Sequence, residues 1–247
     1  MLKQVEGIVL KTQDYGETHK IITIFTKDYG KVSAIARGAN KPKSRLSALS
    51  QIFIQGNFLI YLTKGLSTVQ QGQIVQSHRE IREDIIKTAY ASYLVELTEK
   101  TLEDKQPDYY IYNELLQTLR WINEKDDYLI PLMMYELKLF EKGGFAPILD
   151  RCVNCGSHEL LHSFSIGEGG ILCQQCQSLD PSKIVLNKAI IKILPILLHV
   201  RLEKVGNISV KQENQQLIRK ILDHYYDQYG GYPLKSKRFL AQIDLLQ

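Results

Sequence analysis

The sequence predicts an α+β protein, in which a small five-stranded barrel precedes a mostly α-helical domain with a four-cysteine insert. Three observations predict this arrangement. Apolar and polar residues alternate through residues 1–78, with a turn signal about every ten residues. Apolar residues recur at helical spacing from Ile81 onward. All four cysteines lie within residues 152–176, as two Cys-x-x-Cys pairs.

The first part contains five segments with the alternation of a β-strand. We expect strands at 5–12, 20–26, 31–37, 52–61 and 67–77, and a short helix near 46–49. Five short strands with an irregular or helical link after the third suit the Greek-key barrel called the OB-fold. Other five-stranded barrels, such as SH3-like ones, would give much the same pattern. We therefore predict an OB-fold domain at residues 1–79.

The second predicted domain, residues 80–247, is mostly helical. Its helices are expected at 81–99, 107–123, 127–142, 186–200 and 210–229, with a last helical turn or two after the segment 234–240. Pro107 supplies a start signal, and Gly143 with Gly144 ends the third helix. The longest apolar run, residues 189–200, is too short to span a bilayer, so no membrane contact is expected.

The four cysteines predict a metal site. Cys152 and Cys155 form the first pair, Cys173 and Cys176 form the second, and 17 residues separate the pairs. Two such pairs at this separation bring four thiolates onto one tetrahedral Zn²⁺. Four thiolates close the coordination shell, whereas catalytic zinc keeps a position open. The sequence thus predicts one structural zinc in an insert at about residues 148–180.

Other interpretations of the cysteines are weaker. Disulfides need an oxidising compartment, but the N-terminus shows no apolar signal region, which favours the cytoplasm. His78 and Glu80 match the His-x-Glu of zinc deaminases, but Arg151 replaces the proline expected before the cysteine pair. We also find no P-loop and no nucleophile elbow, so no enzymatic activity is expected. A zinc hydrolase or deaminase remains the enzyme alternative.

Basic residues are concentrated near the N-terminus. Residues 1–80 hold eleven lysines and arginines against five acids, which indicates a polyanion-binding surface. Five cations and no acid lie in residues 31–45, namely Lys31, Arg37, Lys41, Lys43 and Arg45. Gly38 and Pro42 interrupt regular structure there, so we expect an exposed loop that binds phosphates without sequence preference. The alternative is a solvated loop without a ligand. Tyr15, Tyr29 and Tyr61 are candidates for base stacking.

Several segments taken together resemble the RecO family of DNA repair and recombination proteins. They are 7–10, 15–21, 26–31, 36–45, 143–147 leading into the cysteine pairs, and 235–240. The resemblance spans essentially the whole chain in order. It implies an OB-fold followed by a helical domain with a zinc site. The DNA-contact role then falls on Lys31, Arg37, Lys41, Lys43 and Arg45, and the zinc-ligand role on the four cysteines.

The resemblance also implies a non-enzymatic recombination mediator. Such a protein binds single- and double-stranded DNA and anneals complementary strands. Together with RecR, it helps load RecA onto single strands coated with single-strand binding protein (SSB), whose acidic C-terminal tail it contacts. It would act in the cytoplasm, associated with the nucleoid. The alternative from the residues alone is an RNA-binding OB-fold protein with a structural zinc site.

Overall fold

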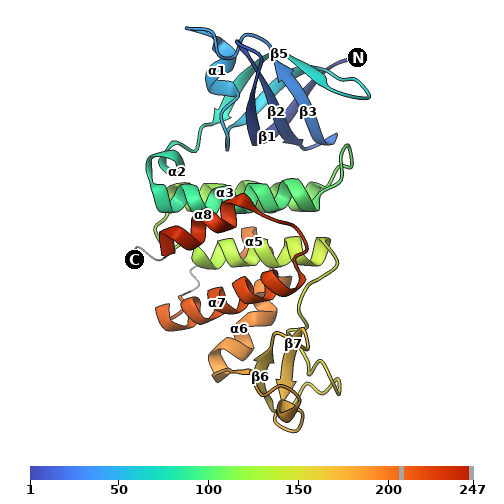
Figure 1. Cartoon of the computed structure of the whole chain (residues 1–247), viewed down its shortest axis with the longest axis vertical. Coiled ribbons are helices and arrows are strands. Elements are labelled where there is room, and N and C mark those ends of the chain that lie inside the picture. The colour runs from blue at the N-terminus through green and yellow to red at the C-terminus, as the bar shows by residue number, and fades with distance from the viewer. Residues whose placement is uncertain (206–208, 245–247) are drawn as a thin grey trace. The chain divides into compact units, whose positions relative to one another are not determined.

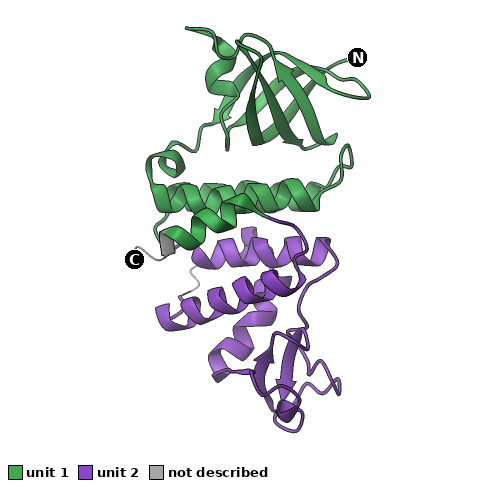
Figure 2. Ribbon diagram, in the orientation of Figure 1, with its two compact units in different colours: residues 1–126, 234–247 green, residues 127–233 purple. Residues whose placement is uncertain are grey.

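The structure, a computed structural model, describes residues 1–205 and 209–244. The chain forms two compact units (Figure 2). Unit 1 comprises Met1–Asp126 together with the chain from Leu234 onward, and unit 2 comprises Asp127–Pro233. The domain boundary expected after residue 79 stays a prediction, and the expected end of the second domain at residue 247 lies outside the described residues.

Unit 1 begins with a closed barrel of five strands. Figure 1 draws this barrel in blue and cyan. Its strands are β1 (Leu2–Tyr15), β2 (His19–Thr26), β3 (Gly30–Ala36), β4 (Gln55–Tyr61) and β5 (Ser67–Gln76). They close in the order β1-β2-β3-β5-β4, with β4 pairing back onto β1. The short helix α1 (Arg45–Leu49) follows β3, where the OB-fold pattern expects a link. The predicted barrel is therefore confirmed.

Alternation along the strands fills the interior of the barrel. Side chains at every second position point inward, so Val5 and Val9 of β1, Ile22 and Ile24 of β2, and Phe58 of β4 form one buried cluster. The strand β4 starts later than the predicted residue 52, because the chain first turns. Phe53 has a positive φ of 70°, which a continuous strand does not accommodate.

The helices of unit 1 are α2 (Arg79–Glu83), α3 (Ile85–Thr101), α4 (Tyr109–Glu124) and α8 (Lys235–Asp244). A single helix was expected over 81–99, but Asp84 divides it. Its extended backbone ends α2, and its carboxylate accepts the N–H groups of Ile86 and Lys87 at 2.8 and 2.9 Å. Aspartate is a favourable N-cap, so it starts α3 at this point.

Helix α8 corrects the prediction for the C-terminal segment. Residues 235–240 are themselves helical, and α8 packs beside α3 (Figure 1). Glu96 of α3 accepts the backbone N–H groups of Lys235 and Ser236 at 3.1 and 2.8 Å. These first N–H groups have no partner within the helix, and a carboxylate there also complements the helix dipole. The helix start therefore depends on a residue 139 positions earlier in the chain.

Unit 2 combines three helices with a small sheet. The helices are α5 (Leu129–Lys142), α6 (Lys188–His199) and α7 (Gln212–Tyr229), with short 3₁₀ turns η1 (Gln177–Leu179) and η2 (Leu202–Lys204). A buried pair joins α5 to α7, since Arg219 Nη2 donates to Glu136 Oε1 at 2.7 Å. The sheet has the order β7-β6-β8, from β7 (Gly170–Cys173), β6 (Leu161–Ser165) and β8 (Ile184–Val185).

The helices observed in residues 1–205 and 209–244 were searched for a membrane-spanning segment. None of them combines the length and the apolar character that crossing a bilayer requires.

Candidate nucleic-acid interface and metal centre

Residues 37–45, here called the basic segment, connect β3 to α1 on the barrel. The side chains of Arg37, Lys41, Lys43 and Arg45 are exposed. None of the four forms an ion pair with another described residue of the chain. These four cations are consequently available to an external anion.

Backbone contacts hold the basic segment against the hairpin formed by β1 and β2. The Asn40 N–H donates to the Thr18 carbonyl at 2.9 Å, and the Gly38 N–H donates to His19 Nδ1 at 2.9 Å. Gly38 has a φ of 71°, in the left-handed region that favours glycine. The segment is thus positioned by its backbone N–H groups, which donate to a carbonyl and to the His19 imidazole, and no charged group of its lysines or arginines takes part.

One acidic side chain lies against the basic segment. Asp14 accepts from Asn40 Nδ2 at 2.8 Å and lies 3.3 Å from Lys20 Nζ. The hydrogen bond from Asn40, followed by the contact with Lys20, lowers the pKa of Asp14 below its usual value. Asp14 is therefore ionised near neutral pH and reduces the positive potential of the segment.

Lys31 differs from the other four candidate DNA contacts. Its side chain is only 12% exposed, and Nζ donates to the carbonyls of Glu99 and Leu102 at 2.6 and 2.8 Å. Nζ also lies 3.3 Å from Asp104. These carbonyls belong to the C-terminal end of α3, where a cation complements the helix dipole. Lys31 consequently stabilises the attachment of α3 to the barrel, and its charge is already neutralised.

The three tyrosines proposed for base stacking lie in different surroundings. Tyr15 is 49% exposed and pairs with His19 across the β1–β2 hairpin that holds the basic segment. Tyr61 is 50% exposed at the end of β4. Tyr29 packs partly buried against the barrel core. Tyr15 is thus the one positioned to extend the surface of the basic segment.

The four cysteines converge in unit 2. The turn that holds Cys152 and Cys155 precedes β6, Cys173 ends β7, and Cys176 follows in the next turn. Their four Sγ atoms all lie within 4.8 Å of one another, so they could hold a metal ion. The Sγ atoms of Cys155 and Cys173 are 3.8 Å apart. A tetrahedron with Zn–S bonds of about 2.3 Å has an edge of about 3.8 Å, so the spacing fits zinc.

Backbone N–H groups prepare one of these thiols for metal binding. Burial raises the pKa of Cys152, but hydrogen bonds from the backbone of Cys155, Cys173 and Asn154 outweigh it and lower the pKa to about 6. At Cys176, the Asn154 amide lowers the pKa, whereas burial and the neighbouring thiols raise it to about 11. Four adjacent thiols cannot all ionise alone, so a bound dication is needed to displace the remaining protons.

The fold and these two sites define a class of protein, in which an OB-type barrel with an exposed basic segment is joined to a helical region with a four-cysteine centre. Residues 1–78 match the family model "Recombination protein O N terminal", and residues 82–238 match "Recombination protein O C terminal".

Whole-chain comparisons agree. The chain is 53% identical over 244 residues to the DNA repair protein RecO of Oceanobacillus iheyensis, covering 99% of this chain and 95% of that protein. It is 47% identical to RecO of Bacillus pumilus, covering 100% of this chain and 96% of that protein. It is 46% identical to RecO of Bacillus mycoides, with both chains fully covered. The chain belongs to the RecO family, which supports a role in DNA repair and implies interaction with DNA.

Proposed function

We propose that the protein is a non-enzymatic DNA repair and recombination mediator whose barrel binds single- and double-stranded DNA through the basic segment. The observation that carries the proposal is the set of four exposed cations, held on an ordered segment without internal charge partners. Lys31 is left out of this set because its ammonium is occupied by α3. We further propose that it anneals complementary strands and, together with RecR, helps load RecA onto SSB-coated single strands.

Phosphate binding by these cations explains why the proposed interaction has no sequence preference. Each neutralised phosphate releases condensed counterions, and this term is the same for every base sequence. Arginine side chains additionally clamp phosphates with two hydrogen bonds. The same neutralisation lowers the repulsion between two single strands, which is what annealing requires.

The four-cysteine centre is proposed to hold one structural Zn²⁺. Four thiolates would complete its coordination shell and leave no position for a substrate. When bound, the ion would tie the turn of Cys152 to the turn of Cys176, and so hold β6 and β7 in register. We assign the contacts with RecR and the SSB tail to no particular residues. The proposed site of action is the cytoplasm, at the nucleoid.

Charge reversal of the basic segment tests the DNA contact. The triple variant Arg37→Glu, Lys41→Glu, Lys43→Glu should bind single-stranded and duplex DNA roughly 100-fold more weakly at low salt. The slope of log affinity against log salt should shrink by about 2 to 3. The matched control reverses three exposed lysines of unit 2, Lys188, Lys192 and Lys220, with the same change in net charge. An equal loss in both variants would show that the basic segment is not the site.

The mediator role needs a separate assay. Complementary strands coated with SSB should anneal faster when the protein is added, and an unchanged rate would contradict the proposal. Competition between single-stranded DNA and RNA of the same sequence distinguishes the RNA-binding alternative, because a reader of the 2′-hydroxyl prefers RNA.

A further inference from the structure

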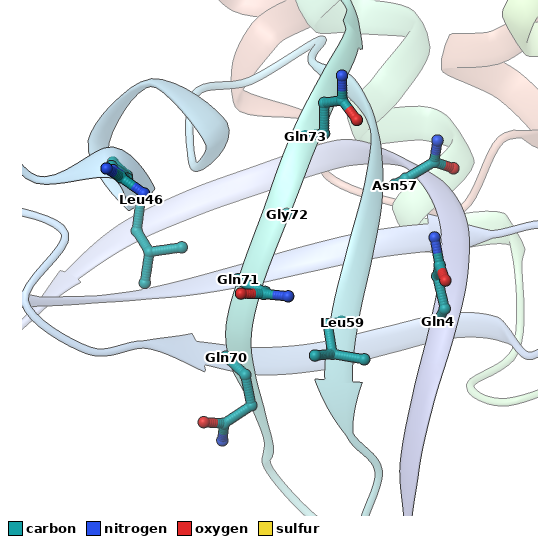
Figure 3. A pocket seen from close by; sticks show the side chains of 9 residues that line it. Gln4, Leu46, Asn57, Leu59, Gln70, Gln71, Gly72 and Gln73 are labelled. Carbon is teal, nitrogen blue, oxygen red and sulfur yellow. The ribbon is translucent and has the colours of Figure 1, made fainter.

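The barrel carries a hollow of about 500 Å³ on the outer face of β1, β4 and β5, closed on one side by α1 (Figure 3). Five of its nine lining residues carry side-chain amides, namely Gln4, Asn57, Gln70, Gln71 and Gln73. Leu46 and Leu59 supply apolar surface, and Arg45 is the charged residue of the lining. No acidic side chain lines the hollow. Its volume is in the range of sites for small organic groups, roughly 300–1,000 Å³.

Strand register explains how amides from three strands meet. Leu59 of β4 lies opposite Gln4 of β1 on one side and opposite Gln71 of β5 on the other. Directly opposed residues share one face of a sheet. Asn57 and Gln73 form the next opposed pair on that face, while Phe58, which lies between Asn57 and Leu59 along β4, points into the core. Figure 3 shows Gln4, Asn57, Leu59 and Gln71 on neighbouring strands around the hollow.

Helix α1 lies close to the strands at this place because β5 has a glycine there. A Cβ at Gly72 would lie 2.6 Å from Leu49 Cδ2 and 2.8 Å from the Asn57 carbonyl. Any other residue at this position would therefore displace α1 or β4. Since Arg45 is both the end of the basic segment and the first residue of α1, the basic segment borders the hollow.

The five amides are available to a ligand. None of their side-chain groups forms a hydrogen bond with a residue in the part of the chain that the structure describes. Each amide offers two N–H donors and one carbonyl acceptor in a single plane. Donors and acceptors of this kind match the edges of nucleobases, and the nearby leucines can contact a base face.

We propose that this hollow binds unpaired bases of a single-stranded DNA whose phosphates lie along the basic segment. The inference rests on the proposed DNA-binding function and adds a base subsite to it. Arg45 lies where a single-stranded DNA would pass from the basic segment to the hollow. Its guanidinium can bind a phosphate or stack on a base. In duplex DNA the bases are stacked and paired, so a duplex gains the phosphate contacts without the base contacts.

A peptide is the weaker candidate occupant. An extended peptide binds a sheet through the free backbone groups of an edge strand. Here β1 pairs with β2 and β4, and β4 pairs with β1 and β5, so neither of these two strands offers a free edge at the hollow. β5 pairs with β3 only from Ser67 to Val69, so its following residues have a strand partner on one side, β4. The lining therefore offers a ligand mainly side-chain amides on the face of three strands, and a strand edge only along β5.

The test uses the full-length protein with the changes Asn57→Leu and Gln71→Met, which keep the side-chain size and remove the amides. Affinity for a mixed-sequence single strand of about 20 nucleotides should fall roughly tenfold, because two amides that hydrogen-bond to bases are lost. Affinity for the duplex of the same length, and the salt slope, should stay unchanged. The control Gln51→Met removes an exposed amide outside the hollow and should change neither.

An abasic oligonucleotide of the same length separates bases from phosphates. It should bind the wild type and the double variant equally, and more weakly than the normal strand binds the wild type. An equal loss for single strand and duplex, or no loss at all, would overturn the inference. Loss of binding to an acidic peptide without loss for single strands would assign the hollow to a peptide instead.

Two precautions keep the result interpretable. If the double variant melts at a lower temperature, the single change Gln71→Met at an exposed position gives the same comparison, with an expected loss of affinity of about threefold for one lost amide. Failure of the proposed DNA-binding function would give a different result. In that case the charge reversal of Arg37, Lys41 and Lys43 would leave the affinity for both single-stranded and duplex DNA unchanged, whether or not the hollow variants lose affinity.

Discussion

The four-cysteine centre of unit 2 and the basic segment of unit 1 achieve their proposed tasks by opposite arrangements. The cysteine Sγ atoms converge within 4.8 Å, and two of the four residues, Cys152 and Cys173, are buried. The cations of the basic segment are exposed and form no ion pairs with described residues. A metal ion needs converging ligands, whereas a phosphate chain needs a row of separate cations that are free in the unbound protein.

Lys31 lies in the basic run of the sequence but has the converging contacts of a structural residue. It belongs to the same run of cations in the sequence, but its Nζ converges on two carbonyls and a carboxylate of unit 1. A cation that is already surrounded by acceptors has little to gain from a phosphate. Convergence thus indicates a structural role, and exposure without partners indicates a binding role.

The largest effect is expected from Cys173→Ser. Loss of one thiolate should abolish stoichiometric zinc binding and lower the local stability of β6 and β7 by about 5 kcal/mol or more. Hydrogen exchange of the backbone amides in residues 148–180 measures this. Unfolding of unit 1, followed by the fluorescence of the single tryptophan, Trp121, should not change, and neither should DNA affinity. Glu159→Gln, an exposed change in the same insert, is the control. A Cys173→Ser variant that kept its stability but lost DNA binding would contradict the separate roles of the two sites.

A smaller effect is expected from Lys31→Met. Two carbonyls at the end of α3 lose a charged donor, which should lower the free energy of unfolding of unit 1 by about 2 kcal/mol. Urea unfolding monitored through Trp121 measures the change. The folded variant should keep its DNA affinity. The paired variant Lys41→Met should behave in the reverse way, with normal stability and weaker DNA binding. A large loss of DNA affinity in the folded Lys31→Met variant would show that Lys31 contacts DNA.

A further prediction concerns pH and His78. The His78 ring is buried, and its Nδ1 is 2.7 Å from the Phe53 carbonyl. Burial is the main cause that lowers the pKa of His78, and Arg120 and Arg82 act in the same direction. The unfolded chain therefore binds the proton more tightly, so unit 1 should lose stability as the pH falls below about 6.5.

The variant His78→Asn should remove this part of the pH dependence. Asparagine tolerates the positive φ of 46° at this position, so the backbone is preserved. Unfolding of unit 1 through Trp121 between pH 5 and pH 8 compares the variant with the wild type. His224→Asn, at an exposed position of unit 2, should leave the profile unchanged. Identical profiles in the wild type and His78→Asn would rule out this histidine as the cause.

The smallest effect is expected from Asp14→Asn. The change removes a negative charge beside the basic segment and keeps an acceptor for Asn40. DNA affinity at low salt should rise about twofold, and the gain should disappear at high salt. Titration at two salt concentrations measures it, with Glu159→Gln as the distant neutralising control. An unchanged affinity would mean that DNA does not approach this end of the barrel.

Local patterns in the sequence predict the barrel and the cysteine cluster, because both depend on short-range regularities. Strand alternation places Val5, Val9 and Ile22 in the core, and the spacing within each Cys-x-x-Cys pair brings two thiols together. The role of Lys31 has no such signal, since its carbonyl partners lie 68 and 71 positions away. Local sequence patterns do not predict the hollow either. Its glutamines are visible in residues 70–73, but Gln4 and Asn57 join them only through strand register.

The return of α8 to unit 1 has a consequence for how the chain is made. Unit 2 is inserted into unit 1, because residues before Asp127 and after Pro233 belong to the same compact unit. During synthesis the barrel and α3 emerge first, and the helix that Glu96 starts emerges only after unit 2. Until then, the face of α3 that α8 covers stays open. The ten residues of α8 thus complete the packing of unit 1 late in folding, and a nascent chain that stops before Leu234 would leave the side of α3 that faces α8 accessible to chaperones or to aggregation.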